Sequence, residues 1–95
     1  MKRGVITLYV RAACPLCEEA EATLRALVAE QGVERIDIVD IESDASLHQR
    51  FVAEIPAIEI GDRLLTNASG RLRIAAFLEA AAAVDDREND RAVTR

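Results

Sequence analysis

Cys14 and Cys17, three residues apart, are the side chains of this chain best suited to carry chemistry. They are the only two cysteines among 95 residues, and Pro15 and Leu16 lie between them. A C-x-x-C pair placed between a strand and a helix is typical of a thiol–disulfide redox centre. The thiolate is the form of cysteine that attacks disulfides, so the surroundings of the two sulfurs decide what they can do.

The two cysteines fall where an expected strand passes into an expected helix. Residues 5–10 form a nearly continuous apolar run rich in β-branched side chains, as in a buried strand. Pro15 suits the first position of a helix, because the N–H that it lacks would have no intrahelical partner there. Apolar residues then recur at helical spacing to about residue 31, and Gly32 is expected to end the helix.

The start of that helix favours a thiolate. Its first N–H groups have no intrahelical partner, and they carry a partial positive charge. Cys14 lies at or just before the helix start and Cys17 one turn further on the same face, which suits one exposed attacking sulfur and one sheltered resolving sulfur. Two other interpretations stay open. In the first, the cysteines are small apolar fillers. In the second, Cys14 holds an iron–sulfur cluster or metal between two subunits, because one chain offers only His48 and carboxylates as further ligands.

The remaining pattern predicts an α/β fold. The elements expected after the first helix are a strand at 36–41, a short helix capped by Ser43 or Asp44, a hairpin of strands at 57–60 and 63–66 around Gly61-Asp62, and a last helix capped by Asn67 or Ser69 and running to about Ala81. The strand–helix–strand start implies a parallel pair with a right-handed crossover. We therefore expect the order β-α-β-α-β-β-α and a mixed four-stranded sheet flanked by helices.

One domain is expected over residues 1–84, followed by a tail. Residues 85–95 are charged and lack periodicity, which predicts a frayed or disordered end. The net charge is −5 and no basic patch is visible, which argues against a nucleic-acid partner. No segment approaches the roughly 20 apolar residues of a membrane span, and the first apolar run is too short for a secretory signal. We therefore expect a cytoplasmic protein with no membrane partner.

The segment from Tyr9 to Glu18 resembles the active-site segment of glutaredoxins, and is most similar to short bacterial glutaredoxin-like proteins with the motif Y-x-R-x-x-C-x-x-C-E. Glu54-Ile55-Pro56 resembles the thioredoxin-fold motif in which a cis-proline faces the active cysteines. The resemblance covers roughly residues 4–82 in the order of its elements. It implies a thioredoxin-like fold and disulfide exchange as the activity.

The resemblance also implies roles for particular residues. Cys14 would be the nucleophile that forms a mixed disulfide, and Cys17 the resolving thiol. Pro56 would be cis, and the backbone of Ile55 would pair with an extended, cysteine-containing substrate. Arg11 occupies the position where glutaredoxins often carry a lysine for the glutathione carboxylate. The alternatives are an ordinary trans-proline at a strand start and a solvated turn charge at Arg11.

Two departures from the glutaredoxin pattern bear on the substrate. Glutaredoxins usually place two glycines and then an aspartate before the last helix, whereas this chain has Ser69-Gly70-Arg71, without the acid that would meet a γ-glutamyl group. A free helix N-terminus around Ser69 and Gly70 can still hold a carboxylate. Leu16 replaces the usual tyrosine between the cysteines, which favours an apolar rim and a protein substrate.

The sequence thus predicts a thiol–disulfide oxidoreductase that reduces protein or small-molecule disulfides through a Cys14/Cys17 dithiol. No bound cofactor and no metal are expected, glutathione or a thioredoxin-type reductase would restore the dithiol, and the protein is expected to be a monomer. Two alternatives belong to other classes: a carrier that holds an iron–sulfur cluster or metal through Cys14 at a subunit interface, and a redox-inactive interaction module with idle cysteines.

Overall fold

A computed structural model describes residues 5–31 and 35–94, with side chains described as far as residue 82. The elements follow in the order β1 (Val5–Val10), α1 (Pro15–Gln31), β2 (Arg35–Asp40), the 3₁₀ helix η1 (Ile41–Ser43), α2 (Ala45–Phe51), β3 (Ala57–Ile60), β4 (Arg63–Leu65) and α3 (Arg71–Thr94). This confirms the predicted order of strands and helices, with η1 as an addition. Gly32, the predicted end of the first helix, lies outside the described residues.

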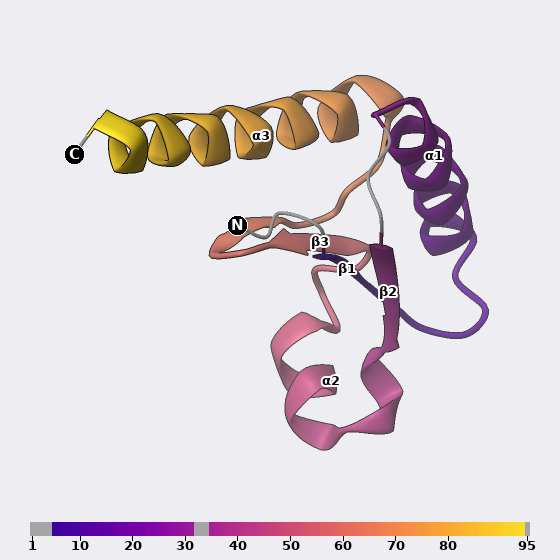
Figure 1. Ribbon diagram of the computed structural model, residues 1–95. Coiled ribbons are helices and arrows are strands. Elements are labelled where there is room, and N and C mark those ends of the chain that lie inside the picture. Colours follow the sequence, from indigo (N-terminus) through magenta and orange to yellow (C-terminus); the bar gives the residue numbers. More distant parts are fainter. Residues whose placement is uncertain (1–4, 32–34, 95) are drawn as a thin grey trace.

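The strands form one four-stranded mixed sheet in the order β2-β1-β3-β4, as predicted. β1 runs parallel to β2, and Val10 at the end of β1 lies opposite Asp40. β3 runs antiparallel to β1, with Ala57 opposite Tyr9, and β4 runs antiparallel to β3. The end of β1, the end of β2 and the start of β3 therefore lie side by side. They form one edge of the sheet, made of strand ends, and the cysteine loop extends from this edge (Figure 1).

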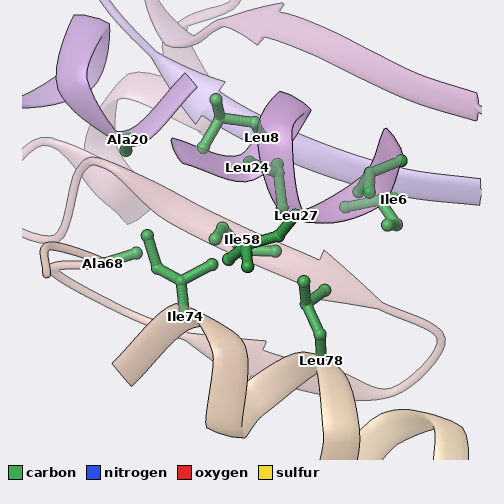
Figure 2. Packing of buried hydrophobic residues seen from close by; sticks show 10 residues of the cluster. Ile6, Leu8, Ala20, Leu24, Leu27, Ile58, Ala68, Ile74 and Leu78 are labelled. Carbon is green, nitrogen blue, oxygen red and sulfur yellow. The ribbon is translucent and has the colours of Figure 1, made fainter. Parts of the chain in front are cut away.

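The helices cover the two faces of this sheet in separate groups (Figure 1). Alternate side chains of β1 point to opposite faces, so Ile6 and Leu8 meet α1 and α3 while Tyr9 meets α2. Figure 2 shows the larger core, in which side chains of α1 and α3 close over the central strands. Its buried members are Ile6, Leu8, Ala20, Leu24, Leu27, Val28, Ile58, Ala68, Ile74 and Leu78. The sheet from which the cysteine loop extends is therefore covered by packed helices on both faces.

Side-chain capping sets the boundaries after β2. The predicted strand at 36–41 ends one residue early, because the Asp40 carboxylate accepts the N–H of Glu42 at 2.9 Å and starts η1 at Ile41. Of the two predicted caps for α2, the structure selects Asp44, whose carboxylate accepts the N–H of Ser46 at 2.9 Å. Short side chains with oxygen acceptors compete well for the free N–H groups at such positions.

The predicted caps of the last helix are wrong. α3 begins at Arg71, so Gly70, with a φ of 90°, holds the position predicted for Asn67 or Ser69. The physical reason is that the preceding loop is tied to the segment before β3. The N–H of Asn67 donates to the carbonyl of Glu54 at 2.8 Å, and that of Ala68 donates to the carbonyl of Pro56 at 2.7 Å.

α3 also differs from the predicted pattern at its other end. The helix continues to Thr94, through the charged residues where a frayed or disordered tail was expected. From residue 71 onward the chain contains no glycine or proline, and it is rich in alanine and arginine, which are strong helix formers. The tail was predicted because apolar periodicity is lost there, but this loss bears on packing rather than on helix formation. The domain boundary at residue 84 stays a prediction.

Within residues 5–31 and 35–94, no helix combines the length and the apolar character needed to cross a membrane.

Candidate redox site

Cys14 closes the short loop that connects β1 to α1. Ala13, the residue before it, has a φ of 56°, and this left-handed residue turns the chain toward the helix. α1 begins at Pro15, as predicted, and the carbonyl of Cys14 accepts the N–H of Glu18 at 3.1 Å. Cys14 therefore occupies the position just before the helix, beside N–H groups that have no partner within it.

Cys14 and Cys17 form a disulfide, with their Cα atoms 5.2 Å apart. Cys14 is partly exposed, whereas Cys17 is buried with only 3% of its surface accessible. The backbone N–H of Cys17 donates to the Sγ atom of Cys14 at 3.1 Å. After reduction, the same N–H and the positive end of the helix dipole would stabilise a thiolate at Cys14. Cys14 is thus accessible from solvent, whereas Cys17 is shielded by the surrounding protein.

Apolar side chains lie next to Cys14 at the surface. Leu16, between the two cysteines, is 54% exposed, and Pro15 is also exposed. An exposed leucine next to a partly exposed sulfur makes the surface beside Cys14 apolar.

The segment before β3 lies next to the cysteine loop and has an unpaired backbone group. The Ile55–Pro56 peptide bond is cis. Because Ala57 pairs with Tyr9, the residues just before it lie across from the end of β1. The carbonyls of Glu54 and Pro56 are taken by the loop before α3, but the N–H of Ile55 donates no hydrogen bond, and its carbonyl accepts none, within the described residues. Ile55 therefore offers a free donor and acceptor at this edge.

Arg11, the cation nearest to Cys14 in the loop, has a protein partner. Its Nε atom lies 3.8 Å from the Oε2 atom of Glu42 in η1, and both side chains are roughly half exposed, at 42% and 46%. The sequence prediction named Arg11 but missed Glu42. The pairing arises because β1 and β2 end side by side, with Val10 opposite Asp40. Once a parallel pair of strands is assumed, the alternation of side chains along the two strands could have indicated the contact between Arg11 and Glu42.

Ser69 and Gly70, also predicted as binding residues, lie in the exposed loop before α3. This loop touches the cis-proline segment through the bond from Ala68 to Pro56. The guanidinium of Arg71, however, pairs with Glu30 at 3.2 Å, near the C-terminal end of α1 and far along the helix from Cys14. The first turn of α3 therefore faces the end of α1 remote from the cysteines (Figure 1). No hydrogen bond joins Ser69 or Gly70 to the cysteines among the described residues, and their role stays a prediction.

Tyr9 serves packing rather than the redox site. Its ring stacks on Phe51 of α2 with the ring centres 4.2 Å apart, and its hydroxyl donates to the Oε1 atom of Glu59 at 2.5 Å. Burial, followed by the hydrogen bond to Glu59 and its charge, raises the pKa of Tyr9 to about 12. The residue therefore fixes α2 on the sheet below the site.

In the part of the chain that the structure describes, no group of three or more histidine, cysteine, aspartate or glutamate side chains is placed to hold a metal ion.

Comparison with known families assigns this fold and site to a class. The model of the family described as "Glutaredoxin-like domain (DUF836)" matches residues 5–79, which is most of the chain. The chain therefore belongs to the glutaredoxin-like domain family, and it has the thioredoxin fold. Together with the Cys14–Cys17 pair, this membership supports a redox role.

Solved structures agree with that assignment. The chain is similar to the Northeast Structural Genomics target protein XcR50 from X. campestris, with 28% identity over 79% of this chain and 96% of the other, at a TM-score of 0.65. Thioredoxin 1 from the thermophilic eubacterium Thermosipho africanus is 14% identical over 86% and 98% of the two chains, with a TM-score of 0.65. Chloroplastic thioredoxin z is 16% identical over 83% and 78%, with a TM-score of 0.60. The two thioredoxins share the fold alone. No curated protein matches the chain.

Proposed function

We propose that this protein is a thiol–disulfide oxidoreductase that reduces disulfides through Cys14 and Cys17. The observation that carries the proposal is the unequal exposure of the two sulfurs at the start of α1. Cys14 is partly open and accepts the N–H of Cys17 on its sulfur, while Cys17 is buried behind it. A nucleophile must reach its substrate, whereas a resolving thiol needs only to reach the nucleophile.

The reaction follows from this arrangement. The Cys14 thiolate bonds to one sulfur of the substrate disulfide, and the other substrate sulfur leaves as a thiolate with the electron pair. Cys17, once deprotonated, then attacks the Sγ atom of Cys14, and the first substrate sulfur leaves as a second thiolate. The substrate has gained two electrons and, in water, two protons. The enzyme is left with the Cys14–Cys17 disulfide, and two glutathione molecules or a thioredoxin-type reductase return the electrons.

The free backbone of Ile55 supports a peptide substrate. An extended chain that adds to this edge as a strand can donate to the Ile55 carbonyl and accept from its N–H. The exposed Leu16 then offers apolar contact to the residues flanking the substrate cysteine. Arg11 would place a guanidinium, paired with Glu42, near the site. We further propose that the protein acts as a monomer, since one chain supplies both sulfurs. The proposed location is the cytoplasm.

Trapping the mixed disulfide tests the assignment of roles. In reduced Cys17→Ser protein, a cysteine-containing peptide disulfide is expected to leave half of itself bonded to Cys14, as an added mass that dithiothreitol removes. The unaltered protein should accumulate little adduct, because Cys17 resolves it. Cys14→Ser protein should form none. An adduct at Cys17 instead, or equal adducts in both variants, would contradict the assignment.

A further inference from the structure

Glu42 holds a fixed position beside the cation of the cysteine loop. The N–H of Glu42 donates to the Asp40 carboxylate at 2.9 Å, and the Ser43 hydroxyl donates to the Asp40 carbonyl at 2.7 Å. These bonds fix the turn of η1 from which the Glu42 side chain reaches Arg11, at 3.8 Å. The positive charge nearest to Cys14 in its loop is therefore partly offset by a carboxylate of the protein itself.

The surrounding segments add more negative charge. The elements that meet at this edge of the sheet are the start of α1, the end of β2 with η1, and the segment before β3. Their acidic side chains are Glu18, Glu19, Asp40, Glu42, Asp44 and Glu54. The cations on the same segments and on α2 are Arg11, paired with Glu42, and Arg50, whose guanidinium lies 4.5 Å over the ring of Phe51. A third cation, Arg73, donates to the carbonyl of Asn67 at 2.7 Å, in the loop that is bonded to Glu54. The entrance to Cys14 thus carries an excess of negative charge.

We propose that Glu42 is a specificity-determining residue that selects cationic disulfide substrates over anionic ones. This inference rests on the proposed function and names its substrate class: extended peptides with lysine or arginine beside the disulfide-bonded cysteine. By pairing with Arg11, Glu42 offsets the positive charge that would otherwise attract a substrate carboxylate. Glutathione carries two carboxylates and one ammonium group, so its disulfides belong to the disfavoured class.

The charge of the substrate, rather than its shape, distinguishes the favoured class from the disfavoured one. The groups involved are exposed, so each one changes a rate by a modest factor and the effect weakens with salt. A change in the charge near Cys14 also alters its thiolate fraction, which changes the rates for all substrates together. The ratio of rates for two substrates that differ only in charge cancels this common effect. The ratio is therefore the quantity to measure.

The probes are two peptides of equal length, one with lysine and one with glutamate two residues before a single cysteine. Each is joined by a disulfide to 2-thiopyridone, a neutral leaving group. The Cys14 thiolate bonds to the peptide sulfur, and 2-thiopyridone leaves with the electron pair and is read by its absorbance. Glutathione joined to the same leaving group is the third probe. Rates are measured with the reduced full chain at low salt and again at about 0.5 M salt, where screening shortens the Debye length to a few ångströms.

The proteins compared are the unaltered chain, Glu42→Gln, Arg11→Gln, and Glu79→Gln as a matched control. Glu79 is exposed on α3, outside the segments of the site, and its variant has the same charge change as Glu42→Gln. The unaltered chain is expected to prefer the lysine peptide. Glu42→Gln should lower the lysine-to-glutamate ratio about two- to five-fold and raise the relative rate with the glutathione probe, whereas Arg11→Gln should raise the ratio by a similar factor. Glu79→Gln should leave the ratio unchanged, and high salt should bring the ratios together.

Three results would overturn the inference, and they differ in whether they also contradict the proposed function. Reaction at Cys14 with equal rates for both peptides, or a ratio that Glu42→Gln leaves at the unaltered value, contradicts the role of Glu42 and leaves the proposed function in place. An absence of any Cys14-dependent release from all three probes contradicts both.

Discussion

At the scale of single residues, the site depends on how two identical side chains are made unequal. Cys14 stands before the first turn of α1 and is partly exposed, whereas Cys17 lies within the helix and is 3% exposed. A lone backbone N–H, that of Cys17, points at the Cys14 sulfur from 3.1 Å. A C-x-x-C spacing predicts this inequality as soon as the helix start is placed, because one turn of helix separates an end position from an interior one.

The reduced protein is therefore expected to react with alkylating agents at Cys14 first. Limiting iodoacetamide near pH 7 should label Cys14 well before Cys17, since Cys14 combines access to solvent with the helix N-terminus. Peptide mapping by mass spectrometry after a series of short exposures gives the two rates. The same series in urea is the control, and the difference should largely disappear there. Faster labelling of Cys17 in the folded protein would contradict the proposed roles.

Tyr9 gives a second prediction at this scale, because it is the only tyrosine of the chain and the chain has no tryptophan. Tyrosinate absorbance therefore reports one residue. The folded protein should titrate with a pKa of about 12, mainly because of burial. In urea the midpoint should return to about 10. A midpoint near that lower value while circular dichroism still shows native structure would contradict the buried hydrogen bond to Glu59.

The sign of the linked effect on stability follows from the direction of this shift. The folded pKa is raised above the unfolded one, so folding favours the protonated phenol. This contribution to the free energy of unfolding is fully present below about pH 10, and it is lost as the pH rises toward about 12. Tyr9→Phe protein should lack this part of the alkaline loss of stability in denaturant titrations.

At the scale of elements, α1 is held in place by its packing on the sheet. Leu24 is fully buried between α1 and the central strands, and it belongs to the core that Ile58 and Ile74 complete (Figure 2). This layer fixes the axis of the helix that carries both cysteines. Apolar spacing along residues 15–31 predicts such a face, and the structure confirms that Ala20, Leu24, Leu27 and Val28 are buried.

Leu24→Ala is expected to lower the free energy of unfolding by roughly 2–5 kcal/mol, because it removes buried side chain and leaves a cavity. Leu72→Ala is the matched control, since Leu72 on α3 is 85% exposed and its substitution makes the same chemical change. It should change stability by about 0.5 kcal/mol or less. Urea denaturation of the oxidised proteins, followed by circular dichroism, gives both values. Equal effects of the two substitutions would show that Leu24 does not lie in the core.

At the scale of the whole molecule, the features predicted correctly from the sequence are those that depend on patterns of a few neighbouring residues. The order of elements, the mixed sheet and the helix start at Pro15 are confirmed, because apolar periodicity and proline act over a few residues. The contact of Arg11 with Glu42 was not predicted, since it joins residues 31 apart in sequence. The start of α3 at Arg71 was missed for a similar reason: the bonds from Asn67 and Ala68 to the segment before β3 are tertiary.

The continuation of α3 to Thr94 shows the opposite bias. The charged residues after Val84 lack an apolar face, and the absence of such a face suggested disorder. Helix propensity requires no such face, and residues 71–94 contain no helix breaker. Periodicity is thus a guide to which helices pack and a weaker guide to where they end.

The central claim is that Cys14 and Cys17 form a reversible redox pair, and the most direct measurement is their thiol–disulfide equilibrium against graded glutathione buffers. Rapid acid quenching, alkylation and mass spectrometry give the fraction oxidised at each buffer ratio. The account predicts a reversible intramolecular disulfide with a midpoint between about −180 and −280 mV, a window that includes glutaredoxin- and thioredoxin-type pairs. Thiols that stay reduced across the whole series, or that become oxidisable only after a chelator is added, would contradict it.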